Sequence, residues 1–147
     1  MADTRVQLEV EDWVRREWLS KKYNQKFSRE RLRLTAGGVF DFDAVSSDNT
    51  IVANISTSSG VTSGGKNPAA KLQKLRADML FLLMATAGTK LIVLTEEDMY
   101  ELCLKEKESG RVPTEIEFIL VELPEELAKS LNEAKKVASN EMLTRRK

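Results

Sequence analysis

Residues 39–56, with the sequence VFDFDAVSSDNTIVANIS, decide the fold that this chain is expected to adopt. In the two outer runs, residues 39–45 and 50–56, the character of the side chains repeats at every second residue. This period of two is typical of β-strands. The connection, residues 46–49, consists of Ser, Asp and Asn, whose side chains hydrogen-bond to nearby backbone and favour turns. The stretch therefore predicts a β-hairpin with a short polar loop.

The register of this hairpin follows from its loop. We expect Val45 to pair with Thr50. Counting back from that pair places Asp41 directly opposite Asn54, with Asp43 on the same partly polar face. The other face is predicted to be core, and it consists of Phe40, Phe42, Ala44, Ile51, Ala53 and Ile55.

Composition excludes several kinds of chemistry. The 147 residues include no histidine, which excludes Ser-His-Asp and Cys-His triads and histidine-ligated zinc. A single cysteine, Cys103, cannot form an internal disulfide and favours a reducing interior. Because 23 basic residues balance 23 acidic ones, no net charge draws the chain to nucleic acid or to an anionic membrane. Any such binding must be local, and carboxylates, lysines, tyrosines or a metal ion remain to carry out chemistry.

Length and hydropathy predict the number of domains and the cellular location of the protein. At this length we expect one domain, residues 1–147. The first residues lack the apolar run of a signal peptide, and the longest apolar run, residues 79–85, is too short to cross a bilayer. We therefore expect a cytoplasmic protein with no membrane partner.

Outside the hairpin, apolar periodicity and helix-capping residues predict four helices and three more strands. The buried character of residues 90–95 predicts a strand that runs parallel to its neighbour. The order αβββαβαβα predicts an α/β fold of three layers, with a mixed five-stranded sheet and flanking helices. The predicted elements are a helix ending near Asn24, a strand over 30–36 and a Gly37-Gly38 turn, the central hairpin, a helix from Asn67-Pro68 towards Gly88, the strand at 90–95, a helix through Lys107, a strand over 114–123 and a helix from Pro124.

This order of elements resembles the restriction-endonuclease-like superfamily, the PD-(D/E)XK nucleases, over residues 5 to about 95. The signature of that family is an Asp on the second strand and a Glu-x-Lys or Asp-x-Lys on the third. A Glu from the first helix and a basic or amide residue from the helix after the third strand often complete the site. The resemblance implies a restriction-endonuclease-like fold and a phosphodiesterase ancestry.

The family's site residues carry over to this chain one by one. Asp43, which is followed by two apolar residues, resembles the strand-two Asp, and Asp41 competes with it. The triplet falls on Asn54-Ile55-Ser56, so that asparagine stands where the second carboxylate belongs and serine where the lysine belongs. The remaining positions of the family's site correspond to Glu17 on the first helix and to Gln73 or Lys71 on the later one.

These departures bear on catalysis. The resemblance implies one or two Mg²⁺ ions held by carboxylates, with a lysine that orients the attacking water. Asn54 supplies no charge to a hard cation, and Ser56 cannot replace an ammonium group. Losing one electrostatic stabiliser commonly costs on the order of a hundred- to a thousandfold in rate. In an active alternative, Asp41 and Asp43 bind the metal, and the lysine's work is done by Lys66 or Lys71.

A cluster of basic residues opens the predicted second helix. Such a cluster is able to bind phosphates, although a solvated helix face is the more common reason for one. Its members are Lys66, Lys71, Lys74 and Arg76.

Three hypotheses follow. The first is a divergent, catalytically impaired member of the superfamily that binds DNA, RNA or a protein partner. The second is an active Mg²⁺-dependent endonuclease with relocated groups. The third is a non-enzymatic assembly protein that forms a homodimer or a larger homo-oligomer.

Overall fold

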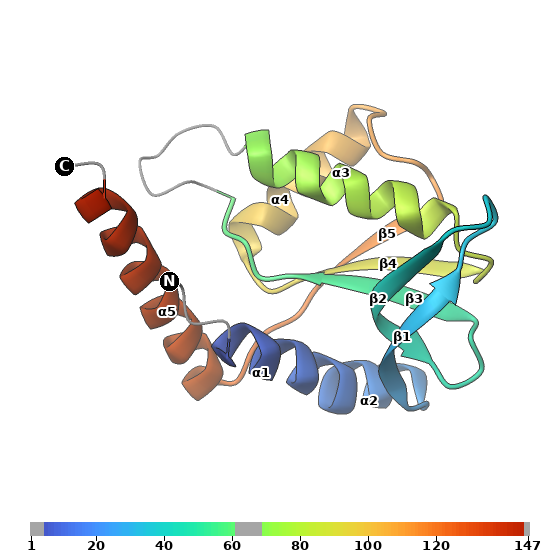
Figure 1. Cartoon of the computed structure of the whole chain (residues 1–147), viewed down its shortest axis with the longest axis horizontal. Coiled ribbons are helices and arrows are strands. Elements are labelled where there is room, and N and C mark those ends of the chain that lie inside the picture. Colours follow the sequence, from blue (N-terminus) through green and yellow to red (C-terminus); the bar gives the residue numbers. More distant parts are fainter. Residues whose placement is uncertain (1–4, 61–68, 146–147) are drawn as a thin grey trace.

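The computed structural model describes residues 5–60 and 69–145, and five strands within them form one mixed sheet (Figure 1). The sheet order is β1-β2-β3-β4-β5. The first three strands form an antiparallel meander, and β3, β4 and β5 run parallel to one another. The strands are β1 (Phe27–Arg33), β2 (Val39–Ser46), β3 (Ile51–Ser56), β4 (Thr89–Leu94) and β5 (Ile116–Leu120).

Helices cover both faces of the sheet, which confirms the predicted α/β class with a mixed five-stranded sheet and flanking helices (Figure 1). On one face lie α3 (Ala69–Leu83) and α4 (Glu97–Glu108). The other face is covered by α5 (Glu125–Arg145) and by a helical segment at the amino-terminal end. This segment consists of α1 (Arg5–Trp13), the π-helical turn η1 (Val14–Leu19) and α2 (Ser20–Tyr23).

Two apolar clusters fill the spaces between the layers, because side chains of β3 and β4 alternate between the faces. Val52 and Ile92 belong to the cluster under α3 and α4. Ile51 and Leu91, each one residue earlier, belong to the cluster under α1 and α5. The sheet is therefore buried on both sides, in keeping with a parallel arrangement.

Several predicted boundaries agree with the structure. The first helix ends at Asn24, which caps it with a left-handed φ of 53°. Gly37 takes a φ of 100° in the turn between β1 and β2, a conformation that favours glycine. Two strand predictions need correction: β1 begins at Phe27, which is buried, and β5 stops at Leu120. The predicted helix start at Asn67-Pro68 lies outside the described residues.

The predicted hairpin register is wrong by two residues. Val45 pairs with Val52 rather than with Thr50. Side-chain bonds replace the last backbone pairs of the hairpin, because the Ser46 hydroxyl accepts the N–H of Ile51 at 3.0 Å and Asp48 accepts the N–H of Thr50 at 3.0 Å. The loop between the paired ends of β2 and β3 is therefore longer than the sequence predicts.

A β-bulge in β2 also changes which side chains share a face. On β1, one residue, Arg29, stands between the partners of Val45 and Phe42, whereas β2 has two residues there, Asp43 and Ala44. The extra residue reverses the alternation, so Phe42 packs under α3 and Ala44 packs under α1. The prediction that Phe42 and Ala44 share a face is therefore wrong.

Within the described ranges, no helix combines the length and the apolar character that crossing a membrane requires.

Candidate functional site

Asp43 lies at the bulge, where β2 and β3 stop pairing. The register pairs β2 with β3 as far as Ala44 and Ala53. Beyond it, the Asp43 carboxylate accepts the backbone N–H of Ile55 at 2.8 Å, and the Asp43 carbonyl accepts a hydrogen bond from Arg15 at 2.9 Å. The side chain of Asp43 thus takes the place of a strand neighbour and is held in one orientation.

Asn54 is buried beside Asp43, with 4% of its surface exposed. Its Oδ1 accepts the backbone N–H of Asp43 at 3.3 Å, which assigns the other end of the amide to the amino group. That group, Nδ2, has no hydrogen-bond partner among the described residues. A buried donor left unsatisfied costs about 1–3 kcal/mol. Nδ2 is itself buried, so an acceptor from outside the described residues reaches it only if the side chains that cover it move.

Two further carboxyl groups interact electrostatically with Asp43. Burial is the main cause that raises the pKa of Glu11, on α1, and the negative charge of Asp43 raises it further. Burial likewise raises the pKa of Asp78, on α3, to about 6, with a smaller contribution from Asp43. Burial also raises the pKa of Asp43 itself. Carboxyl groups with raised pKa values from three elements therefore lie around the split between β2 and β3.

Cations balance this negative charge. Arg29 and Arg15 act on Asp43 and lower its pKa, and Lys74 does the same from α3. Lys74 also acts on Glu11 and on Asp78. We call this group the Asp43 cluster, and it consists of Glu11, Arg15, Arg29, Asp43, Asn54, Lys74 and Asp78.

A small polar cavity of about 110 Å³ adjoins the Asp43 cluster. Its walls include Ser56 at the end of β3 together with Lys71, Lys74 and Asp78 on α3. Hydroxyl, ammonium and carboxyl groups thus face one space. This composition suits a polar ligand group better than an apolar one.

Several residues predicted for the site lie elsewhere or have other partners. Asp41 is bonded to Arg31 on the neighbouring strand, at 2.9 and 3.3 Å, and this bond is the main cause that lowers the Asp41 pKa. Asp41 is therefore hydrogen-bonded to a different side chain from Asp43, although the charge of Arg29 acts on both. Glu17 is exposed and forms an ion pair with Lys21 at 3.5 Å.

The π-helical turn η1 explains why Glu11, and not Glu17, belongs to the cluster. In a regular α-helix Glu17 follows Val10 by seven residues and lies on nearly the same face. The buried positions here are Val10, Val14 and Leu19, so the second interval is five residues instead of three or four. The extra residue rotates Glu17 towards solvent.

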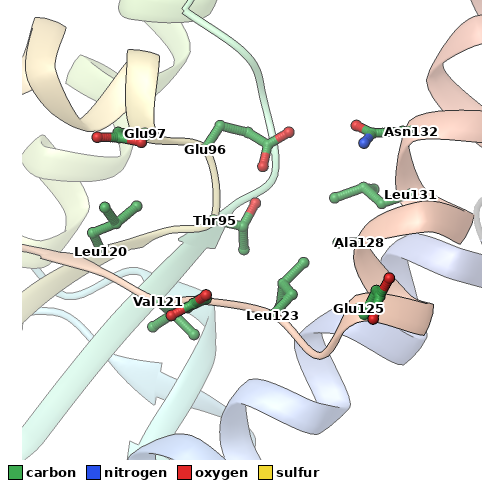
Figure 2. Close-up of a pocket in the computed structure, with 11 residues that line it drawn as sticks. Thr95, Glu96, Glu97, Leu120, Val121, Leu123, Glu125, Ala128, Leu131 and Asn132 are labelled. Atoms are coloured by element: carbon green, nitrogen blue, oxygen red, sulfur yellow. The ribbon is translucent and has the colours of Figure 1, made fainter.

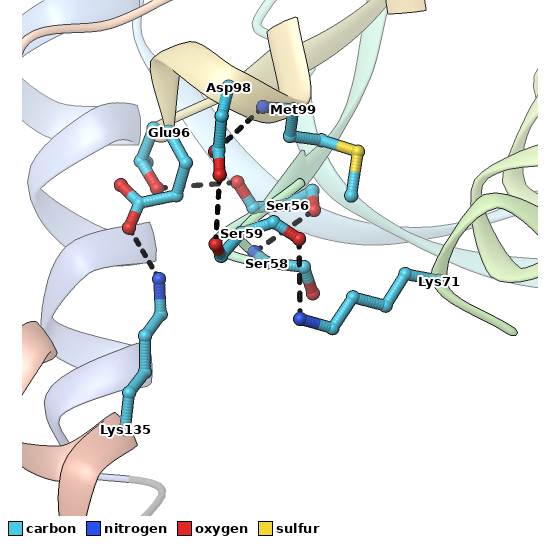
Figure 3. A network of polar contacts seen from close by, with 9 residues as sticks. Ser56, Ser58, Ser59, Lys71, Glu96, Asp98, Met99 and Lys135 are labelled. Atoms are coloured by element: carbon cyan, nitrogen blue, oxygen red, sulfur yellow. Dashed lines mark hydrogen bonds and ion pairs between the residues drawn. The ribbon is translucent and has the colours of Figure 1, made fainter. Parts of the chain in front are cut away.

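Ser56 of the predicted triplet and Lys71 of α3 belong to a network of polar contacts at the end of β3 (Figure 3). The Ser56 hydroxyl accepts the N–H of Ser58 at 3.3 Å. Lys71 donates to the carbonyl of Ser59 at 3.2 Å, and burial lowers its pKa. Ser59 in turn donates to Asp98 of α4, so this network links the end of β3 to α3 and α4.

The other predicted basic residues differ in their surroundings. Arg76 forms an ion pair with Glu106 on α4 at 3.3 Å. Lys74 and Gln73 are exposed on α3, and the charge of Lys74 acts on the Asp43 cluster. Lys66 lies outside the described residues. Sequence reasoning placed Lys74 among the basic residues but missed Glu11 and Asp78 as its neighbours.

The described side chains around Asp43 do not form a preassembled Mg²⁺ site. Within residues 5–60 and 69–145, no group of three Asp, Glu, Cys or His side chains could hold a metal ion. Asn54 directs its oxygen to the Asp43 N–H, which leaves an amino donor that a cation repels. The site offers hydrogen-bond donors and titratable carboxyl groups.

Comparison of the chain with protein-family models, with curated proteins and with solved structures found no match.

Proposed function

We propose that this protein is a catalytically impaired relative of the PD-(D/E)XK nucleases and that it binds nucleic acid at the Asp43 cluster. The observation that carries the proposal is the buried Asn54, which stands where the family resemblance expects a metal-binding carboxylate. Its Nδ2 is a donor without a partner among the described residues, and under this proposal it donates to an oxygen of a phosphate, sugar or base when the side chains that cover it move aside. In this proposal, the change from carboxylate to amide replaces a group that binds a metal ion with a group that donates a hydrogen bond to the ligand.

The order of helices and strands also supports the proposal. The chain follows the order αβββαβ through β4, with β1–β3 antiparallel and β3 parallel to β4. Asp43 lies on the second strand and Asn54 on the third, as the resemblance implies, and Glu11 comes from the first helix. The two strand positions of the resemblance are therefore close to the split in the sheet, and the nearby first-helix acid is Glu11 instead of Glu17.

Charge around the cluster favours phosphate. Arg29 on β1 and Lys74 on α3 are exposed, and both act electrostatically on Asp43. The raised pKa of Asp78, about 6, reduces the negative charge of the cluster as the pH falls towards 6. The cations then outweigh the carboxylates, and polyanion binding strengthens.

The test is binding of labelled single-stranded DNA, duplex DNA and RNA, followed by fluorescence anisotropy at several salt concentrations. We expect at least one of the three to bind with a salt-dependent affinity. Lys74→Ala and Arg29→Ala should each lower the slope of log K against log salt by about one. Lys105→Ala, an exposed position on α4, is the matched control and should leave the slope unchanged. Absence of salt-dependent binding to all three probes contradicts the proposal.

Lys74 favours a second candidate, an active Mg²⁺-dependent nuclease in which this lysine is the relocated one. Its charge acts on Asp43 and Asp78 together, which is what an activating ammonium group requires. Titration with Mn²⁺, followed by heat, separates the two candidates. Saturable binding that is lost in Asp43→Asn, together with metal-dependent cleavage, favours the nuclease, whereas the impaired protein binds no metal at millimolar concentration.

A further inference from the structure

A second cavity, away from the Asp43 cluster, lies between the sheet and α5 (Figure 2). Its volume is about 780 Å³, within the range of roughly 300–1,000 Å³ that small-molecule sites occupy. It opens at the carboxyl ends of β4 and β5, which run parallel. The carboxyl ends of parallel strands are the usual ligand-binding edge of open α/β sheets.

The floor of this cavity is aliphatic. Val121 and Leu131 are buried there, and Leu120, Leu123 and Ala128 are partly exposed towards the space. Figure 2 shows Leu123 and Leu131 approaching each other across it, one from the β5–α5 connection and the other from α5. A ligand with an apolar body therefore gains stabilisation from water removed on both sides.

Carboxylates surround the aliphatic floor. Glu97, Glu122 and Glu125 are exposed along the rim, and Glu96 is partly buried between α4 and α5. Glu97 and Glu125 lie in the first turns of α4 and α5. The rim therefore consists mainly of carboxylate side chains.

One rim carboxylate already binds an ammonium group of the chain. Lys135 extends from α5, and its ammonium group forms an ion pair with Glu96 (Figure 3). An ammonium group on an aliphatic chain thus already occupies one edge of the cavity.

We propose that this cavity is a binding site for an aliphatic polyamine. The ligand's methylene segments lie on the Val121 and Leu131 floor, and its ammonium groups meet the rim glutamates. One terminal ammonium competes with Lys135 for Glu96. The site is independent of nucleic-acid binding at the Asp43 cluster.

The experiment is calorimetric titration of the full chain, freed of nucleic acid, with spermidine. Octanediol and suberate, which have similar lengths but no charge or the opposite charge, are the comparison ligands. We expect saturable binding of spermidine at one site, binding of octanediol at least tenfold weaker and no binding of suberate. Equal affinity for octanediol and spermidine, or no heat with spermidine at millimolar concentration, overturns the proposal.

Variants test whether spermidine binds in this cavity. Ala128→Trp fills it and should abolish spermidine binding, whereas Ala77→Trp, at an exposed position on α3, should leave the affinity unchanged. Unchanged affinity in Ala128→Trp overturns the proposal.

Two milder variants test the same site if the Ala128→Trp protein does not fold. Glu97→Gln should weaken binding about two- to fivefold, and Lys135→Met should strengthen it by a similar factor because Glu96 is released. Weaker binding in Lys135→Met contradicts the competition between Lys135 and the ligand.

Discussion

Replacement of Asp78 by asparagine is expected to change how stability depends on pH. Burial, with the charge of Asp43, raises the pKa of Asp78 from 3.8 to about 6, although Lys74 lowers it. A carboxyl whose pKa is higher in the folded than in the unfolded chain contributes stability that is fully present below the unfolded pKa. That contribution is lost as the pH rises through the folded pKa. The wild-type protein should therefore lose stability between about pH 4 and pH 6 because of this group.

The size of the effect follows from the two pKa values. Their difference, 6 minus 3.8, is about 2 units, and one unit corresponds to about 1.4 kcal/mol, so the upper limit is about 3 kcal/mol. Asp78 is only partly buried, and solvent screens the charge, which reduces the expected effect to about 1 kcal/mol. Asp78→Asn removes the titration. Relative to wild type, the variant should gain about 1 kcal/mol between about pH 3.5 and pH 8.

Urea unfolding at the two pH values measures this difference. Asp48→Asn is a control with the opposite sign, because hydrogen bonds from Thr50 are the main cause that lowers the Asp48 pKa to about 2. That group contributes stability above pH 3.8 that is lost as the pH falls through about 2. Carboxyl resonances followed by NMR give the Asp78 pKa directly. A titration midpoint near 4, or a stability difference between variant and wild type that is equal at both pH values, refutes the reasoning.

Three more predictions concern packing. A methyl group at Gly60 would lie 2.8 Å from the Asp98 backbone, so Gly60→Ala should lower the free energy of unfolding by about 1–3 kcal/mol, while Gly88→Ala, with open space around it, serves as the control in the same urea experiment. Phe42 is fully buried beside the bulge, and Phe42→Ala should cost about 3–5 kcal/mol; a loss below 1 kcal/mol would mean that the bulge does not direct this ring into the core. Burial raises the pKa of the Cys103 thiol to about 11, so a thiol reagent at about pH 8 should react slowly with the folded protein and rapidly in urea. Equal rates in the two conditions contradict the burial of Cys103.

The sequence predicted the class of the fold because its signals were local. Alternation along residues 39–45 and 50–56, the glycines at the first turn and the apolar run at residues 90–95 each indicate an element without reference to the rest of the chain. The order of those elements then limits the layers that can form. Helices on both faces of a five-stranded sheet are what the structure contains.

The assignment of side chains to faces failed where one inserted residue matters. Alternation along β2 does not reveal that Asp43 and Ala44 together stand opposite Arg29, because a bulge depends on the partner strand. The same kind of insertion misled the assignment on the first helix, where η1 rotates Glu17 away from the sheet. The five-residue interval between Val14 and Leu19 is the signal that could have indicated it.

The bulge in β2 and the π-helical turn η1 both lie beside Asp43. Their common location supports the proposed binding site at that residue. The bulge places Asp43 in the split, and η1 contributes Arg15, which binds the Asp43 carbonyl. The unsatisfied donor of Asn54 and the raised pKa of Asp78 add two energetic costs at the same place. Proteins that depart from local rules at one place generally do so where they bind or react. Asn54 also has a structural role there, because its Oδ1 accepts the Asp43 N–H, which would lose this acceptor if position 54 were apolar. Under the proposed function, a ligand that accepts a hydrogen bond from Nδ2 offsets the cost of the second, unsatisfied end of the amide.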